Sequence, residues 1–112
     1  MEMETQSLTR LASQQLAIAT SAPSGRSAST IFGGQHNILR QTMIALAAGQ
    51  KLNEHESPGE ATIQILLGRV RLGAADETWE GSAGDLLVVP DRRHSLEALD
   101  GAVVLLTVAK RT

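Results

Sequence analysis

The chain has 112 residues, enough for one domain with a hydrophobic core. Hydrophobic residues make up 42% of it and charged residues 20%, which is the balance of a globular protein rather than a disordered one. The formal net charge is −2, and Phe32 and Trp79 are the whole aromatic content. This composition argues against nucleic acid or an anionic membrane as the partner. Because the chain has no cysteine, disulfides and thiolate chemistry are excluded.

The start of the chain, Met1 to Glu4, is acidic where a secretory signal peptide would be basic. The longest apolar stretches, such as Ala102 to Leu106, have the length of a strand and are too short to span a bilayer. We therefore expect a cytoplasmic protein that does not insert into membranes.

The first segment with a regular pattern is Ser7 to Thr20, where apolar residues recur near helical spacing among good helix formers. This pattern predicts a short helix. The following Ser21 to Thr30 is rich in Ser, Ala and Gly and predicts a connector, and Phe32 to Gly34 predicts a turn.

After Gly34 the pattern changes to short apolar runs separated by Gly, Asp, Pro or Ser, which predicts an all-β sandwich or barrel. In one of these runs, Val70 and Leu72 alternate with two arginines, as in a half-buried strand. Leu86 to Val89 is apolar on both faces, so we expect it to be central in a sheet or covered by another sheet or subunit. The predicted strands are Asn37 to Ala47, Ala61 to Leu67, Arg69 to Leu72, Thr78 to Glu80, Leu86 to Val89, Ser95 to Ala98 and Val103 to Val108.

Two histidines stand in similar frames. The first frame is Gly49, five residues, then His55 and the turn Ser57-Pro58-Gly59; the second is Gly84, five residues, Pro90, three residues, then His94. These two segments resemble the two motifs of the cupin superfamily, and the resemblance covers Leu39 to Val108. It implies a double-stranded β-helix (jelly-roll) barrel of the RmlC-like cupin type over residues 31–112, preceded by a helix and connector over residues 1–30.

The resemblance also implies a site at the mouth of the barrel, where many cupins bind a divalent metal such as Zn, Ni, Fe or Mn. The family's ligands are His-x-His, a carboxylate or amide, and a last His. His55 and His94 match the first and last of these, whereas Ser57 and Ala61 stand at the other two positions. Glu60 or His36 could supply a third ligand. If Ile63 and Ile65 point into the barrel, however, Ala61 does too and Glu60 points away, because side chains alternate along a strand.

The ligand pocket is expected to contain His55, His94, Gln41 and Arg92. Arg92 could bind a carboxylate or phosphate, or could instead be a rim arginine that pairs with Asp91. We therefore expect a small-molecule-binding protein with weak or absent metal binding, or alternatively a metal-dependent enzyme of the dioxygenase or isomerase type. The apolar strands also indicate a homodimer.

Overall fold

The computed structural model describes residues 3–55 and 59–110, and at Glu54 and His55 it describes the backbone only. Along these residues a single helix is followed by nine strands. The helix α1 spans Leu8–Ser21. The strands are β1 (Arg26–Phe32), β2 (Leu39–Leu46), β3 (Lys51–His55), β4 (Gly59–Leu67), β5 (Arg69–Ala74), β6 (Glu77–Ser82), β7 (Leu86–Val88), β8 (His94–Ala98) and β9 (Ala102–Lys110).

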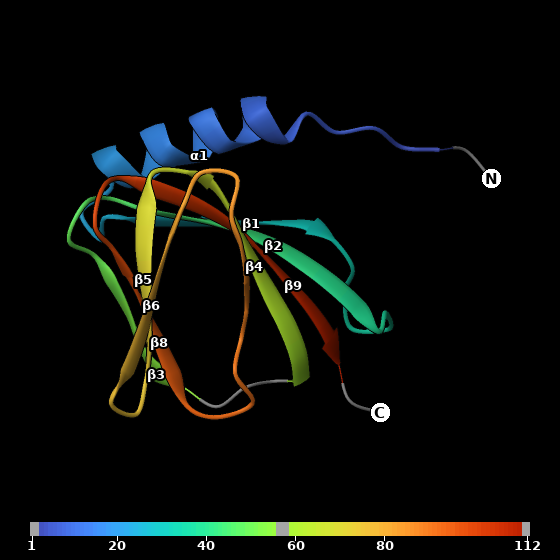
Figure 1. The fold of residues 1–112 in the computed structure, drawn as a ribbon. Helices are drawn as coiled ribbons and strands as arrows, with labels where there is room; N and C mark the ends of the chain where they lie inside the picture. Colours follow the sequence, from blue (N-terminus) through green and yellow to red (C-terminus); the bar gives the residue numbers. More distant parts are fainter. Residues whose placement is uncertain (1–2, 56–58, 111–112) are drawn as a thin grey trace.

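The strands form two antiparallel sheets that face each other (Figure 1). The five-stranded sheet has the order β1-β2-β9-β4-β7, and the four-stranded sheet has the order β3-β8-β5-β6. Neighbours in these sheets are often far apart in the chain, as expected for a jelly roll. The predicted all-β jelly-roll fold with a short N-terminal helix is therefore confirmed.

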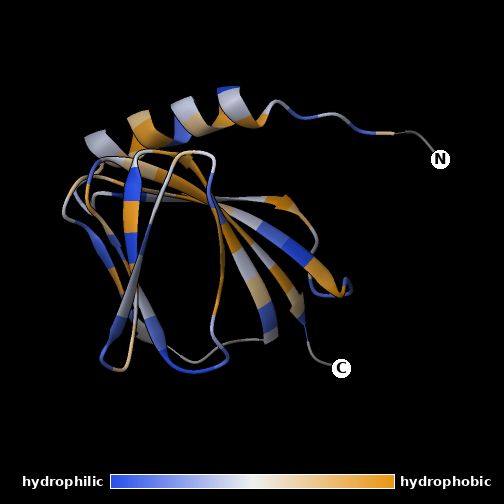
Figure 2. Cartoon of the chain, viewed as in Figure 1, coloured by the Kyte–Doolittle hydropathy of each residue, from blue (hydrophilic) through white to orange (hydrophobic). Residues whose placement is uncertain are grey.

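The main core lies between the two sheets, because each strand turns alternate side chains inward. In β4 the inward residues are Ala61, Ile63 and Ile65, and in β5 they include Val70 and Leu72. The alternation of hydrophilic and hydrophobic residues along β5 is visible in Figure 2. Together the two inner faces make an aliphatic core of Leu46, Ala61, Ile63, Ile65, Val70, Leu72, Val89, Leu96, Ala98, Ala102, Val104 and Val108.

The helix α1 covers part of the outer face of the five-stranded sheet (Figure 1). It begins after Ser7, whose hydroxyl accepts a hydrogen bond from the backbone N–H of Arg10 at 3.2 Å and so caps the helix. Its apolar stripe packs on a second cluster made of Ala12, Ala19, Met43, Ala45 and Val103. No helix among the described residues is long and apolar enough to cross a membrane.

Three features of the fold differ from the sequence predictions. Strand β1 lies within the segment predicted as a connector, because its small Ser and Ala residues fit beneath α1, where Ser27 donates a hydrogen bond to Gln15. Strand β3 was not predicted, since its five residues include only one large apolar side chain. Strand β7 is not central: it is an edge strand of the five-stranded sheet, with Leu86 and Val88 exposed.

Candidate functional site

His94 is the first residue of β8 and points into the barrel on the same face as Leu96 and Ala98. Its side chain is 5% exposed, and it is the sole polar or charged residue among the buried residues that the structure describes. The ring Nδ1 lies 2.9 Å from the backbone oxygen of Arg92. A carbonyl oxygen can only accept, so Nδ1 carries the proton, and Nε2 is the nitrogen that can hold a lone pair.

The backbone register places His55 directly opposite His94, at the end of the β3–β8 pair. The register shifts between Leu52 and His55, which is where the pairing of Leu52 with Leu96 gives way to the pairing of the two histidines. The two histidine frames of the sequence therefore meet at one end of the barrel at the level of the backbone. Ser57, which stands at the second ligand position of the family, lies outside the described residues.

The other candidate metal ligands do not gather around His94. Ala61 is the inward residue of β4 and has no donor atom, whereas Glu60 is exposed on the opposite face, as the strand alternation predicts. His36 is exposed in the turn between β1 and β2, which projects beyond the barrel (Figure 1). No cluster of three or more potential metal ligands occurs among the described side chains. The described donors thus do not fit the four-ligand site that the resemblance implies.

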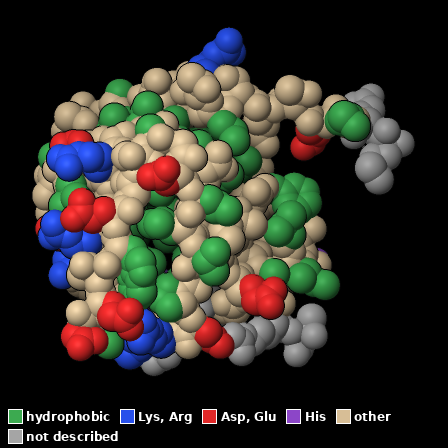
Figure 3. All heavy atoms as spheres, in the orientation of Figure 1, with side chains coloured by type: hydrophobic (Ala, Val, Ile, Leu, Met, Phe, Trp, Pro, Cys, Tyr) green, Lys and Arg blue, Asp and Glu red, His purple; other side chains and the backbone are tan. Residues whose placement is uncertain are grey.

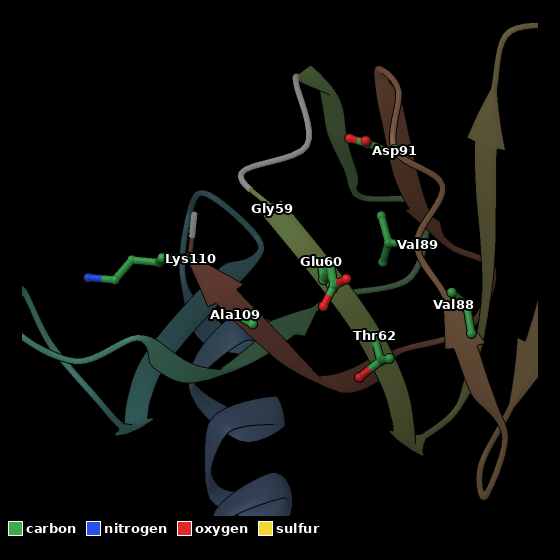
Figure 4. A pocket seen from close by; sticks show the side chains of 9 residues that line it. Gly59, Glu60, Thr62, Val88, Val89, Asp91, Ala109 and Lys110 are labelled. Atoms are coloured by element: carbon green, nitrogen blue, oxygen red, sulfur yellow. The ribbon is translucent and has the colours of Figure 1, made fainter. Parts of the chain in front are cut away.

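An open groove of about 920 Å³ lies beside this end of the barrel (Figure 4). One wall comes from β4, which carries Glu60, and the other from Val88, Val89 and Asp91 (Figure 4). Ala61 and Val89 belong to the barrel core, so the groove reaches from the outer face of the sheet to the inner end of the barrel. The ammonium group of Lys110 points away, because it donates hydrogen bonds to backbone carbonyls in the β1–β2 turn.

Gln41 and Arg92 were both predicted to line the pocket. Gln41 is on the outer face of the five-stranded sheet, the face that carries Met43 beneath α1, and its amide donates to the Thr107 hydroxyl at 3.2 Å. Its phase could not be derived from the sequence, because both faces of β2 are mixed.

Arg92 forms an ion pair with Glu77 of β6 at 2.9 Å. Its guanidinium also lies 5.8 Å from the ring centroid of Trp79, within the range of a cation–π interaction. The prediction of an intramolecular ion pair for this arginine was therefore correct in kind, but the partner is Glu77 rather than Asp91.

Arg40 is a candidate site residue that the sequence reasoning missed. In the sheet it lies beside Val108, and Val108 lies beside Ala61, so the three residues form one lateral row on the inner face. The Arg40 side chain is exposed, and its guanidinium makes no hydrogen bond or ion pair with any described residue. The signal that identifies it is the position of Met43 under α1, which sets the phase of β2 and is a property of the tertiary structure.

No protein-family model matches the chain, and no curated protein matches it significantly. Solved structures do. A conserved protein of unknown function from Streptococcus pyogenes aligns over 100% of this chain and 91% of its own at 24% identity, with a TM-score of 0.74. An RmlC-like cupin from Desulfovibrio desulfuricans aligns over 96% of this chain and 97% of its own at 23% identity, with a TM-score of 0.71. The chain has a cupin fold.

One similar structure is an enzyme. Salicylate 1,2-dioxygenase from Pseudoaminobacter salicylatoxidans is 25% identical and has a TM-score of 0.70, and the alignment covers 89% of this chain but only 30% of the dioxygenase. The structures similar to this chain thus include both a protein of unknown function and an oxygenase.

Proposed function

We propose that this cupin binds a small organic molecule at the end of the barrel where β8 begins, with His94 as the main polar contact. The observation that supports this proposal is the burial of one imidazole in an otherwise aliphatic interior. Burying a polar group costs free energy unless it is hydrogen-bonded, and the Nδ1 of His94 is held by the Arg92 carbonyl oxygen. This hydrogen bond fixes the orientation of the ring and gives Nε2 a defined direction for contact with a ligand.

The surroundings of His94 favour a ligand with an apolar body and an acidic group. The groove beside this end of the barrel offers aliphatic side chains such as Val88 and Val89, which match the apolar body. Arg40 stands on the inner face of β2 without an ion-pair partner among the described residues and can pair with a carboxylate. The ring Nε2 accepts a hydrogen bond when the imidazole is neutral and donates one when it is protonated, so it can contact a hydroxyl or a carboxylate.

The proposal is tested by NMR titration of the histidine ring signals with hexanoate and with its uncharged analogue, hexanamide. We expect both compounds to shift the His94 signals, and we expect hexanoate to bind several-fold more tightly. Arg40→Gln should remove this preference, whereas the matched control Arg92→Gln should retain it, because Arg92 is held by Glu77. An unchanged His94 signal with both compounds would refute the binding site, whereas equal affinities in the unmodified protein would refute only the acidic ligand class.

A metal-dependent enzyme is the second candidate, and one observation favours it. A hydrogen bond from Nδ1 to a backbone carbonyl is the arrangement that orients the Nε2 of a metal-binding histidine, and His94 has it. Elemental analysis of protein purified without a metal column tests this candidate. Stoichiometric Zn, Fe, Mn or Ni that is lost in His94→Ala would support the candidate, and substoichiometric metal removed by dialysis would reject it.

A further inference from the structure

The carbonyl oxygen that orients the ring of His94 belongs to the loop that connects β7 to β8. The start of this loop is tied to β4, because the backbone N–H of Val89 donates to the carbonyl oxygen of Ala61 at 3.0 Å. Within the loop, the N–H of Arg92 donates to the carbonyl oxygen of Pro90 at 2.8 Å. The direction of the Arg92 carbonyl, and with it the orientation of the His94 ring, therefore depends on what holds Arg92 in place.

The side chain of Arg92 is held by β6, the edge strand of the four-stranded sheet. Its Nη2 donates to the Glu77 carboxylate at 2.9 Å, and its guanidinium carbon lies 5.8 Å from the ring centroid of Trp79. The strand register aligns Glu77 with Ala74 and Trp79 with Leu72. Ala74 and Leu72 are buried on the inner side of β5, so their two partners on β6 lie on that same side of the sheet.

Arg92 therefore links two strands that are not neighbours. Its carbonyl contacts His94 at the start of β8, its guanidinium contacts β6, and β5 lies between these two strands. Figure 3 shows acidic and basic side chains gathered over the part of the surface formed by β5, β6 and β8. Other ion pairs of this sheet, such as Arg71–Glu80, join neighbouring strands and do not reach the loop before His94. The Arg92–Glu77 pair ties that loop to the sheet.

We propose that Arg92 is a positioning residue for His94. Glu77 and Trp79 hold its guanidinium and thereby the loop, and its carbonyl keeps the proton of the imidazole on Nδ1, so that Nε2 carries the lone pair. We call Arg92, Glu77 and Trp79 the clasp. An imidazole without this hydrogen bond can carry its proton on either nitrogen, so a loosened clasp lowers the population of the tautomer that accepts at Nε2.

The consequence for binding rests on the proposed function, in which His94 is the main polar contact of the ligand. The orientation of the ring affects hexanoate and hexanamide alike. Arg92→Gln should therefore weaken the binding of both compounds by the same factor and leave the preference for hexanoate unchanged. Arg40→Gln should have the opposite signature, because it removes the preference itself.

Nitrogen NMR of the imidazole rings tests the clasp in the ligand-free protein, at a pH where the rings are neutral. Glu77→Gln removes the ion pair of the clasp, and the matched control Glu80→Gln removes an ion pair of Arg71 from the same strand. We expect Glu77→Gln to raise the population of the Nε2–H tautomer of His94 about threefold, the effect of losing one exposed ion pair, and we expect Glu80→Gln to leave it unchanged.

A charge exchange, Glu77→Arg combined with Arg92→Glu, provides a second variant. It re-forms the ion pair in the reverse direction but loses the contact of the guanidinium in the loop with Trp79, so we expect it to restore part of the original tautomer population. Amide NMR spectra check that each variant keeps the fold. A charge exchange that restores none of the population would overturn the role of the ion pair.

Trp79 is the single tryptophan of the chain, so its fluorescence reports whether the guanidinium stays over the ring. We expect Glu77→Gln to shift this emission together with the tautomer population. A shifted emission with an unchanged tautomer would overturn the inference, because the clasp would then not act on His94. So would an unchanged tautomer and emission, or an equal tautomer change in Glu80→Gln. These measurements use no ligand, whereas the hexanoate titration tests ligand binding, so the two proposals can fail separately.

Discussion

Ala61→Glu is the substitution that tests most directly how the barrel end is built. Ala61 is 8% exposed and belongs to the aliphatic core with Val89 and Val108. A carboxyl group placed there loses much of its hydration, which raises its pKa above that in the unfolded chain. If the pKa rises by about two units, the free energy of unfolding at neutral pH falls by about 3 kcal/mol.

The sign of the pH dependence follows from this direction. The folded state takes up a proton more readily than the unfolded state, so the loss of stability is complete above the raised pKa and disappears as the pH falls below about 4, near the unfolded pKa of a glutamate. Urea unfolding of Ala61→Glu at neutral and at acidic pH measures this dependence. Gln64→Glu is the matched control: it adds the same charge to the same strand at an exposed position, and we expect a change within about 0.5 kcal/mol.

Unfolding of Ala61→Glu in the presence of Zn²⁺ tests the geometry of the site in addition to the burial of position 61. If the new carboxyl group faces His94 and the position of His55, Zn²⁺ at about a hundred times its Kd should return about 2.7 kcal/mol of stability, because it binds the folded state. The gain should vanish in Ala61→Glu combined with His94→Ala. A zinc effect that survives this second substitution would show that His94 does not bind the zinc, and an equal destabilisation by Gln64→Glu would refute the burial of the side chain at position 61.

Three further predictions concern the fold. Ile65→Ala should lower the free energy of unfolding by about 2–5 kcal/mol in chemical denaturation, because Ile65 is fully buried, and a smaller loss would mean that the core collapses around the gap. Gly68→Ala should lower the melting temperature, because Gly68 has φ +76° and a Cβ there would overlap the carbonyl oxygen of Gly101; an unchanged value would contradict this turn geometry. The hydrogen bond from Arg69 keeps the pKa of Asp100 below its usual value, so its stabilisation is present above about pH 4 and is lost as the pH falls through the lowered pKa. Asp100→Asn should remove that small part of the acid dependence of stability, and identical acid titrations of the two proteins would count against the pair.

The candidate site could be predicted from the sequence only in part. The two histidine frames led to the correct fold, because their glycines, prolines and histidines stand at the spacing of the two cupin motifs. The alternation around Ile63 and Ile65 also led correctly to an inward Ala61 and an outward Glu60. The face on which Gln41 lies could not be predicted, because alternation shows which residues share a face but does not show which of two mixed faces is inside.

The sequence by itself thus determined the class of fold, the position of the helix and the inward position of Ala61, whose side chain has no donor atom. These properties follow from local patterns, because strand length, turn residues and side-chain type can all be derived from consecutive residues in the sequence. The tertiary structure alone decided which residues are lateral neighbours. It placed β7 at an edge with Val88 exposed, paired Arg92 with Glu77, and put Arg40 in the inner row with Ala61. The order of the strands and the position of α1 on the sheet determine which residues become lateral neighbours. Both depend on packing between segments that are distant in sequence.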